Sequence, residues 1–244
     1  MPEGDSLREI ARQLSVLVGE HVAVEARNPR AEALAIAPKL DGERLDRVEA
    51  LGKNLVLTFE GGLVLRSHLR MKGRWRVQPA RRAVTGRPWL VIRGREHQAI
   101  LWHGPVLELG RSGLVCLGPE IMASPPDLER MVAGMRKIAQ ETVIGEALLD
   151  QRLVAGIGNL WKAEGLFAAA VSPWARLSEL SCDSLRGTLA TTHRLMVAGR
   201  RKRWVYRRAG KPCPRCGASI RSRPQGEHAG TAYWCPVCQP SVSH

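Results

Sequence analysis

The first residues of the chain carry groups that could form and break covalent bonds. Met1 is followed by Pro2 and Glu3. Proline inside a chain has no N–H and no nucleophilic nitrogen, but removal of the initiator methionine would expose the ring nitrogen of Pro2 as a secondary amine. A terminal amine has a pKa of roughly 7.7–8.0, so a useful neutral fraction exists near pH 7. A chain that keeps Met1 would lack this nucleophile.

Four of the six cysteines have the spacing of a metal site. They form two Cys-x-x-Cys pairs with eighteen residues between the pairs, as in a four-thiolate zinc site. Two disulfides are the alternative, which an intracellular chain disfavours. The sequence therefore predicts one structural zinc ion with the ligands Cys213, Cys216, Cys235 and Cys238. The isolated Cys116 and Cys182 are expected to be ordinary buried residues.

Two short glycine-containing turns carry further polar groups. In ALGKNLVL, Lys53 lies in a tight turn before a strand, where it is either a solvated lysine or a functional amine. In LVAGIGNLWKAEGLF, two glycines allow a tight turn and Asn159 suits the N-cap of the helix that follows. Exposed N–H groups at a helix start attract phosphate, so this turn is a candidate anion site.

The charge of the chain points to a polyanionic partner. Its 244 residues carry a formal net charge of +14, with a pI near 10.4, and nucleic acid is the commonest polyanion. Residues 194–223 hold eleven Lys or Arg and no Asp or Glu. Aromatic residues and cysteines interrupt this block, which favours an ordered binding surface over a solvated tail. No stretch has the opposed basic and apolar faces of an interfacial membrane helix.

The elements that must position these groups begin with a β-rich half. Apolar residues at helical spacing occupy residues 7–18, and Gly19 can end that helix. Residues 55–69 have the pattern of a hairpin around Gly61-Gly62. Further strand-like runs lie at 75–77, 89–92, 99–102 and 106–109. Several short strands at this spacing favour a β-sandwich.

The second half is helical and ends in the cysteine pairs. The pattern changes at Pro125-Pro126, after which helical segments run from residue 127 to about 203. The last stretch is long enough only for a metal-held hairpin. The expected parts are a β-sandwich domain at 1–118, a linker at 119–126, a helical domain at 127–205 and a zinc hairpin at 206–244.

Five motifs, in their order, resemble one protein family across nearly the whole chain. They are MPEG, ALGKNLVL, GIGNLWKAEGLF, GKPCPRCG and YWCPVCQ. They are similar to motifs of the bifunctional DNA glycosylases typified by formamidopyrimidine-DNA glycosylase and endonuclease VIII, and Gly4 resembles the endonuclease VIII branch. The resemblance implies a two-domain α+β fold. Its parts are an N-terminal β-sandwich with an N-terminal helix, and a C-terminal helix–two-turn–helix domain with a zinc-finger β-hairpin.

The resemblance also implies roles for the reactive residues. The amine of mature Pro2 would attack C1′ of a damaged nucleoside, Glu3 would transfer a proton during sugar ring opening, and Lys53 would hold the phosphate near the lesion. The damaged base must first leave the stack. We therefore expect a base excision repair enzyme that removes oxidised bases, chiefly pyrimidines, and nicks the abasic strand by elimination.

The same resemblance implies a set of DNA contacts. The turn HLRMKG lies where the family carries its intercalating residues, so Arg70, Met71 and Lys72 would fill the gap left by the flipped base. The alternative is a turn whose Met71 points into the core. Asn159 would contact the DNA backbone, and His68 is expected to be structural.

Two positions depart from the family pattern. The family usually has Glu at position 6, which is Ser6 here. Its zinc finger usually carries an arginine five residues before the third cysteine, and here that residue is Gly230. In the family, this arginine binds the phosphates around the lesion and aids δ-elimination. Its absence here calls both the phosphate contact and δ-elimination into question. The candidate substitutes are Arg221, Arg223 and His228.

Two other functions stay open on the sequence. Preference for oxidised purines is the alternative within the same class, and a non-catalytic zinc-containing DNA-binding protein is the alternative outside it. No apolar run of eighteen residues and no secretory signal is visible. We expect a monomer in the cytoplasm, associated with the nucleoid, whose partner is damaged DNA and not a membrane.

Binding to undamaged duplex DNA should be strongly salt-dependent. A basic surface that neutralises phosphates releases counterions, so the log–log plot of association constant against salt should have a slope of about −0.9 per phosphate. Fluorescence anisotropy titrations at several salt concentrations measure this slope. A slope near zero would contradict a polyanion-binding surface.

Overall fold

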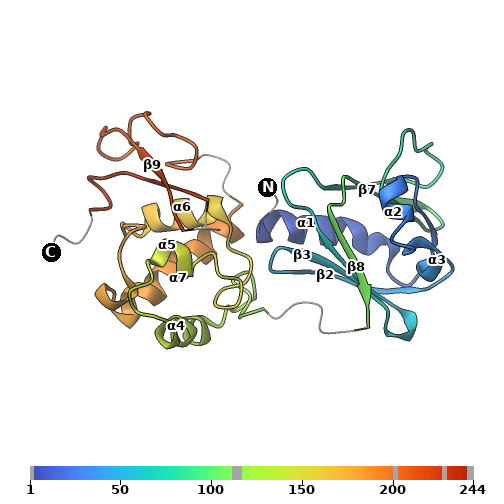
Figure 1. The fold of residues 1–244 in the computed structure, drawn as a ribbon, viewed down its shortest axis with the longest axis horizontal. Helices are drawn as coiled ribbons and strands as arrows, with labels where there is room; N and C mark the ends of the chain where they lie inside the picture. Colours follow the sequence, from blue (N-terminus) through green and yellow to red (C-terminus); the bar gives the residue numbers. More distant parts are fainter. Residues whose placement is uncertain (1–2, 112–116, 200–202, 227–229, 241–244) are drawn as a thin grey trace. The chain divides into compact units, whose positions relative to one another are not determined.

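The computed structural model describes residues 3–111, 117–199, 203–226 and 230–240 (Figure 1). The chain divides into two compact units, residues 1–116 and 117–244. The segment 206–244, which holds the cysteines, belongs to the same compact unit as the helices. None of the described helices is long and apolar enough to cross a membrane.

The first unit is a sandwich of two antiparallel four-stranded sheets, as the strand pattern predicts. The strand orders are β1-β6-β7-β5 and β2-β3-β4-β8. The strands are β1 Ala23–Glu25, β2 Leu45–Leu51, β3 Asn54–Phe59, β4 Val64–His68, β5 Arg74–Pro79, β6 Leu90–Arg93, β7 His97–Trp102 and β8 Val106–Gly110. Alternate residues of β3 are buried, and one core fills this unit. The expected hairpin around Gly61-Gly62 is confirmed as β3 paired with β4.

A helix begins directly after the first residues of the described chain. The helix α1 spans Gly4–Leu14, and a short 3₁₀ turn, Ser15–Leu17, follows it. The regular helix is therefore shorter than the expected 7–18. Its buried face contains Leu7, Ala11 and Leu14, which recur at helical spacing and pack into the sandwich core. This packing fixes where the start of the helix lies within the first unit. Two short helices, α2 Pro29–Glu32 and α3 Ala37–Leu40, follow β1 and precede β2.

The second unit is helical and carries a terminal hairpin. Its elements are α4 Leu128–Lys137, α5 Ile144–Ala147, α6 Asn159–Ala168, α7 Cys182–Val197, β9 Arg221–Pro224 and β10 Thr231–Trp234. Within this unit, α6 lies against the β9–β10 hairpin (Figure 1). The expectation that Cys182 is buried is wrong, because it is exposed at the start of α7. Cys116 lies outside the described residues.

The segment expected to be a linker packs into the second unit instead. Within 119–126, Ile121 is fully buried in the helical core. Its N–H donates to the carbonyl of Ala155 at 3.0 Å, and the N–H of Ala155 donates to the carbonyl of Pro119 at 2.9 Å. Pro125 and Pro126, which suggested a linker, come after this short paired segment.

A buried carboxylate in α6 holds the chain that leads to the cysteines. Glu164 is 2% exposed. Its carboxylate accepts the backbone N–H groups of Trp204, Val205 and Tyr206 at 2.8, 3.0 and 2.8 Å. Charged acceptors form stronger hydrogen bonds than neutral ones. Three consecutive N–H groups of the basic segment are therefore tied to one side chain.

Glu164→Ala should strongly destabilise the second unit. It removes the acceptor of three N–H groups, of which that of Val205 is buried. Because a buried orphan costs about 1–3 kcal/mol, we expect a loss of about 2 kcal/mol or more in the free energy of unfolding. Urea unfolding of the full chain measures this loss. The control Glu129→Ala removes an exposed carboxylate paired with Arg186 and should cost about 1 kcal/mol or less. Equal losses in the two variants would refute the role of Glu164.

Candidate functional site

Glu3 is buried at the start of α1, where Ser6 holds its backbone. Glu3 is 3% exposed. Its N–H donates to the hydroxyl oxygen of Ser6 at 2.8 Å, and that hydroxyl donates to the Glu3 carbonyl at 2.9 Å. In a capping box, a Glu or Gln side chain at this helix position bonds the same N–H. The unusual Ser6 thus performs the backbone contact that such a residue makes. Pro2 lies outside the described residues.

Lys53 lies in the two-residue loop between β2 and β3. Leu51 and Asn54 face each other across this loop, and Gly52 has a φ of 59°, which favours glycine at the first loop position. Asn54 is buried, and its amide donates to the carbonyl of Leu51 at 3.3 Å. The loop therefore presents Lys53 from a fixed backbone.

Arg66 ties this loop to the far strand of the same sheet. Its guanidinium donates to Oδ1 of Asn54 at 3.0 Å and to the carboxylate of Glu108, on β8, at 3.0 Å. The Arg66 side chain is only 17% exposed, so this pair is better shielded than most surface ion pairs. Neither Arg66 nor Asn54 was singled out from the sequence. Asn54 follows Lys53 directly and could have been found from the turn, whereas the Arg66 contact depends on strand pairing.

Glu3 and Lys53 are close enough to affect each other's charge. Burial lowers the pKa of the Lys53 ammonium, and the Glu3 carboxylate opposes that shift. Burial also lowers the pKa of His68, with further lowering from the charges of Arg70, Arg66 and Lys53. The Nδ1 atom of His68 lies 3.3 Å from the backbone nitrogen of Arg70, as an acceptor in the neutral ring would. The structure therefore brings Glu3, Lys53 and His68 into one polar cluster.

The turn after β4 presents three exposed side chains. Arg70, Met71 and Lys72 are all exposed, and Met71 is 63% exposed. The neighbouring Leu69 is 1% exposed and anchors the turn in the core. The alternative in which Met71 points into the core is therefore wrong. An exposed methionine between two cations is suited to contact bases and phosphates.

Asn159 is the first residue of α6 and not its cap. The N-cap is Gly158, whose backbone is extended. The amide of Asn159 donates to the carbonyl of Thr231 at 2.9 Å, which joins the helix start to β10. Gly230 precedes this strand with a φ of 68°, and a Cβ there would lie 3.6 Å from Nδ2 of Asn159. The position of the missing arginine is thus next to Asn159. His228 lies outside the described residues.

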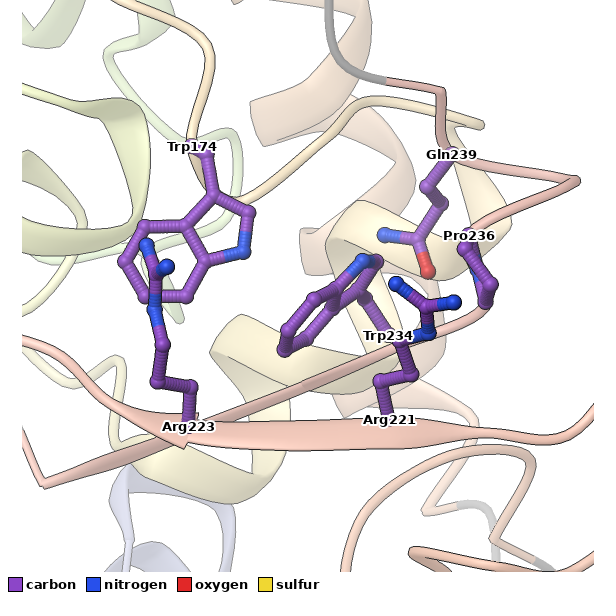
Figure 2. Close-up of a pocket in the computed structure, with 6 residues that line it drawn as sticks. All are labelled: Trp174, Arg221, Arg223, Trp234, Pro236 and Gln239. Carbon is purple, nitrogen blue, oxygen red and sulfur yellow. The ribbon is translucent and has the colours of Figure 1, made fainter.

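Arg221 and Arg223 are exposed on β9 and line a pocket with Trp174 and Trp234 (Figure 2). The guanidinium of Arg223 lies 3.9 Å from the centre of the Trp174 ring. Both arginines therefore face this aromatic pocket. Pro224, at the other end of β9, faces Thr231 across the hairpin.

The four predicted cysteines form one cluster. Their sulfur atoms all lie within 4.8 Å of one another. The Sγ atoms of Cys213 and Cys238 are 3.8 Å apart, and those of Cys216 and Cys235 are 3.5 Å apart. A tetrahedral ion with bonds of about 2.3 Å to sulfur requires separations of about 3.8 Å. The donor set and its dimensions fit one metal ion.

Two family models match the chain. The formamidopyrimidine-DNA glycosylase N-terminal domain matches residues 1–103, and the formamidopyrimidine-DNA glycosylase H2TH domain matches residues 117–202. The two matches fall on the two compact units. They cover the β-sandwich from β1 to β7, with its Lys53 loop, and the helices of the second unit, including α6 with Asn159.

Known relatives match over almost the whole chain. Endonuclease 8 2 of Mycobacterium bovis is 35% identical over 98% of this chain and 100% of its own length. The DNA-(apurinic or apyrimidinic site) lyase Nei2 of Mycolicibacterium smegmatis is 33% identical over 98% of this chain and 99% of its own. Lactococcus lactis formamidopyrimidine-DNA glycosylase, solved on DNA containing an AP site, has a TM-score of 0.82 at 25% identity, covering 98% and 100%. The chain belongs to the formamidopyrimidine-DNA glycosylase and endonuclease 8 family.

Glu3→Gln should lower the pKa of Lys53 further. The Glu3 carboxylate favours the ammonium form, so its removal leaves the effect of burial less opposed. An NMR titration of the Lys53 side chain measures the change. The control Glu9→Gln removes a carboxylate that pairs with Arg12 on the exposed face of α1 and should leave the pKa of Lys53 unchanged. An unchanged Lys53 titration in Glu3→Gln would show that the two groups do not interact.

Proposed function

We propose that the chain is a base excision repair enzyme, a DNA glycosylase with AP lyase activity. Family membership over both units supports this, as does the relative named a DNA-(apurinic or apyrimidinic site) lyase. The observation that carries it is the buried Glu3 carboxyl at the start of α1, near enough to Lys53 for its charge to oppose the effect of burial on the pKa of that lysine. A carboxyl and an amine beside a terminal secondary amine are the groups that excision through an iminium needs.

The proposed reaction starts at the N-terminal amine. After removal of Met1, the nitrogen lone pair of Pro2 attacks C1′, the N-glycosyl bond breaks, and the damaged base leaves and takes up a proton. Glu3 takes the proton that the Pro2 nitrogen loses and passes it to the ring oxygen as the sugar opens, which yields an iminium between the nitrogen and C1′. The iminium acidifies the C2′ proton, and its removal expels the 3′ phosphate by β-elimination. Water then hydrolyses the iminium.

Lys53 is proposed to hold the phosphate next to the lesion. Its fixed loop, tied to β8 through Asn54 and Arg66, supports this role because phosphate binding needs a cation at a defined position. The nearby Glu3 carboxylate favours the charged form of Lys53 against burial. A cation there also stabilises the phosphate that leaves in β-elimination.

The DNA contacts are proposed to come from both units. Arg70, Met71 and Lys72 would fill the space left by the flipped base, which their exposure supports. Asn159 would bind a backbone phosphate at the start of α6, and Arg221 and Arg223 would add charge from the hairpin. We propose oxidised pyrimidines as the preferred bases, oxidised purines being the alternative. We further propose that the enzyme acts as a monomer on nucleoid DNA.

Borohydride trapping on damaged duplex DNA tests this function and its nucleophile. The mature chain should form a covalent adduct that maps to Pro2, because borohydride reduces the iminium. Pro2→Gly keeps a primary amine and should retain some lyase activity, whereas a form that is acetylated or keeps Met1 should form no adduct. An adduct in the blocked form would overturn the Pro2 assignment, and no adduct in any form would favour a non-catalytic DNA-binding protein.

We propose that the cysteine cluster holds one structural zinc ion. Four thiolates are a typical zinc donor set, and the hairpin has only a small core of its own, which a metal would supplement. Purified chain should therefore contain one zinc per molecule by elemental analysis. Cys235→Ser should lose the metal and weaken DNA binding more than it disturbs the β-sandwich. The control Cys182→Ser changes an exposed cysteine outside the cluster and should retain the metal; zinc-free active protein would refute the site.

A further inference from the structure

A pocket at the base of the hairpin combines aromatic and cationic side chains (Figure 2). It has a volume of about 310 Å³ and lies within the second unit. Its lining residues are Trp174, Arg221, Arg223, Trp234, Pro236 and Gln239. No acidic side chain is among these lining residues, so the pocket carries two formal positive charges. Its size and charge suit a small planar anion or part of one.

Both guanidinium groups rise from the same face of β9. Arg221 and Arg223 are two residues apart, so the pleat places them on one side of the strand, and Figure 2 shows them beside the two indole rings. Arg176 and Arg186 of the same unit form ion pairs at 2.7 and 2.5 Å. Within the described chain, neither Arg221 nor Arg223 has a carboxylate at such a distance. Their charge is therefore available to a ligand.

The two indoles supply flat aromatic surfaces. The rings of Trp174 and Trp234 are 5.5 Å apart at 78°. The guanidinium of Arg223 lies 3.9 Å from the centre of the Trp174 ring, so the Trp234 ring is the one left for a ligand. A ligand with a stacking face and anionic oxygens would match this ring and the two guanidinium groups.

We propose that this pocket binds one unstacked nucleotide of single-stranded DNA. The base would stack on Trp234, and Arg221 and Arg223 would hold the adjoining phosphates. Aromatic platforms combined with Arg bind single strands in this sequence-tolerant way, and guanidinium binds phosphate oxygens in pairs. This inference rests on the proposed function in taking DNA as the polyanion. It extends that function to DNA with an unpaired stretch next to the duplex.

The pocket is separate from the anion site expected at Asn159. Asn159 bonds the carbonyl of Thr231, at the start of β10, whereas the pocket contains Trp234, at its end. Three residues of strand span about 10 Å. A strand that passes Asn159 could therefore place a neighbouring nucleotide in the pocket. An acidic peptide with an aromatic residue is the rival occupant.

Binding of a short, undamaged oligothymidylate tests the proposal. Arg221→Ala/Arg223→Ala and Trp234→Leu should each weaken binding by about fivefold to a hundredfold, and Trp234→Phe should restore most of the loss. The control Arg12→Ala/Arg186→Ala removes the same net charge from arginines paired with Glu9 and Glu129. It should lose far less. Because the double arginine variant changes only exposed strand residues, it stays informative if Trp234→Leu misfolds. Equal losses in the pocket and control variants would overturn the proposal.

Photocrosslinking locates the contact directly. An oligothymidylate with one 5-iododeoxyuridine should crosslink to Trp174 or Trp234 of the wild-type chain, and a crosslink confined to other residues would overturn the site. An acidic aromatic peptide that binds the wild type more tightly than the oligonucleotide, and fails to bind the double arginine variant, would reassign the pocket to a protein partner. Because the probe carries no lesion, these results stand whatever borohydride trapping shows for the proposed enzyme.

Discussion

The second unit depends on charged side chains buried in α6. Lys162 and Glu164 are 0% and 2% exposed, and a charge in the interior is costly unless hydrogen bonds replace its water. Lys162 donates to the side chain of Gln225 at 3.1 Å, and Gln225 donates to the carbonyl of Pro173 at 2.8 Å. Together with the hydrogen bonds of Glu164, these bonds fix the position of the hairpin against α6. The groups proposed to meet DNA are presented from that position.

In the first unit, hydrogen bonds of polar side chains likewise fix the loop that carries Lys53. Asn54 is buried, and its side chain bonds both the carbonyl of Leu51, at the end of β2, and Arg66. Arg66 in turn reaches Glu108 on β8. Lys53 is thereby held by residues that contact no DNA in the proposed mechanism. Such support matters because a displacement of about 1 Å in a positioned group can cost a hundredfold in rate.

Short sequence patterns were enough to predict the β3–β4 hairpin and the cysteine cluster. The hairpin of β3 and β4 follows from two apolar runs around Gly61-Gly62, and the cysteine cluster follows from ligand spacing alone. β1 is only three residues long, and β2 has one fully buried residue, so neither has a strong strand signal. The positions of these two strands and of the segment around Ile121 depend on tertiary contacts. Ile121 joins the helical core despite the two prolines that follow it.

Side-chain contacts between distant residues were outside the reach of the sequence. Asparagine is favoured at N-caps, but Asn159 is already helical. The N-cap is Gly158, whose backbone is extended. The contact of Arg66 with Asn54 and that of Lys162 with Gln225 join elements whose pairing no motif encodes. The pocket of Trp174 and Trp234 likewise needs a loop and a strand sixty residues apart. The motifs indicated candidate reactive residues but not the residues that hold them in place.

The conformation of Gly230 limits which side chains this position can carry. With a φ of 68°, the position accepts glycine freely, whereas any residue with a side chain would cost roughly 1–2 kcal/mol there. An arginine placed here by one mutation would therefore lower the stability of the hairpin while it added a phosphate contact. Cations on the neighbouring strand β9, such as Arg221 and Arg223, carry no such cost, because neither residue has a positive φ.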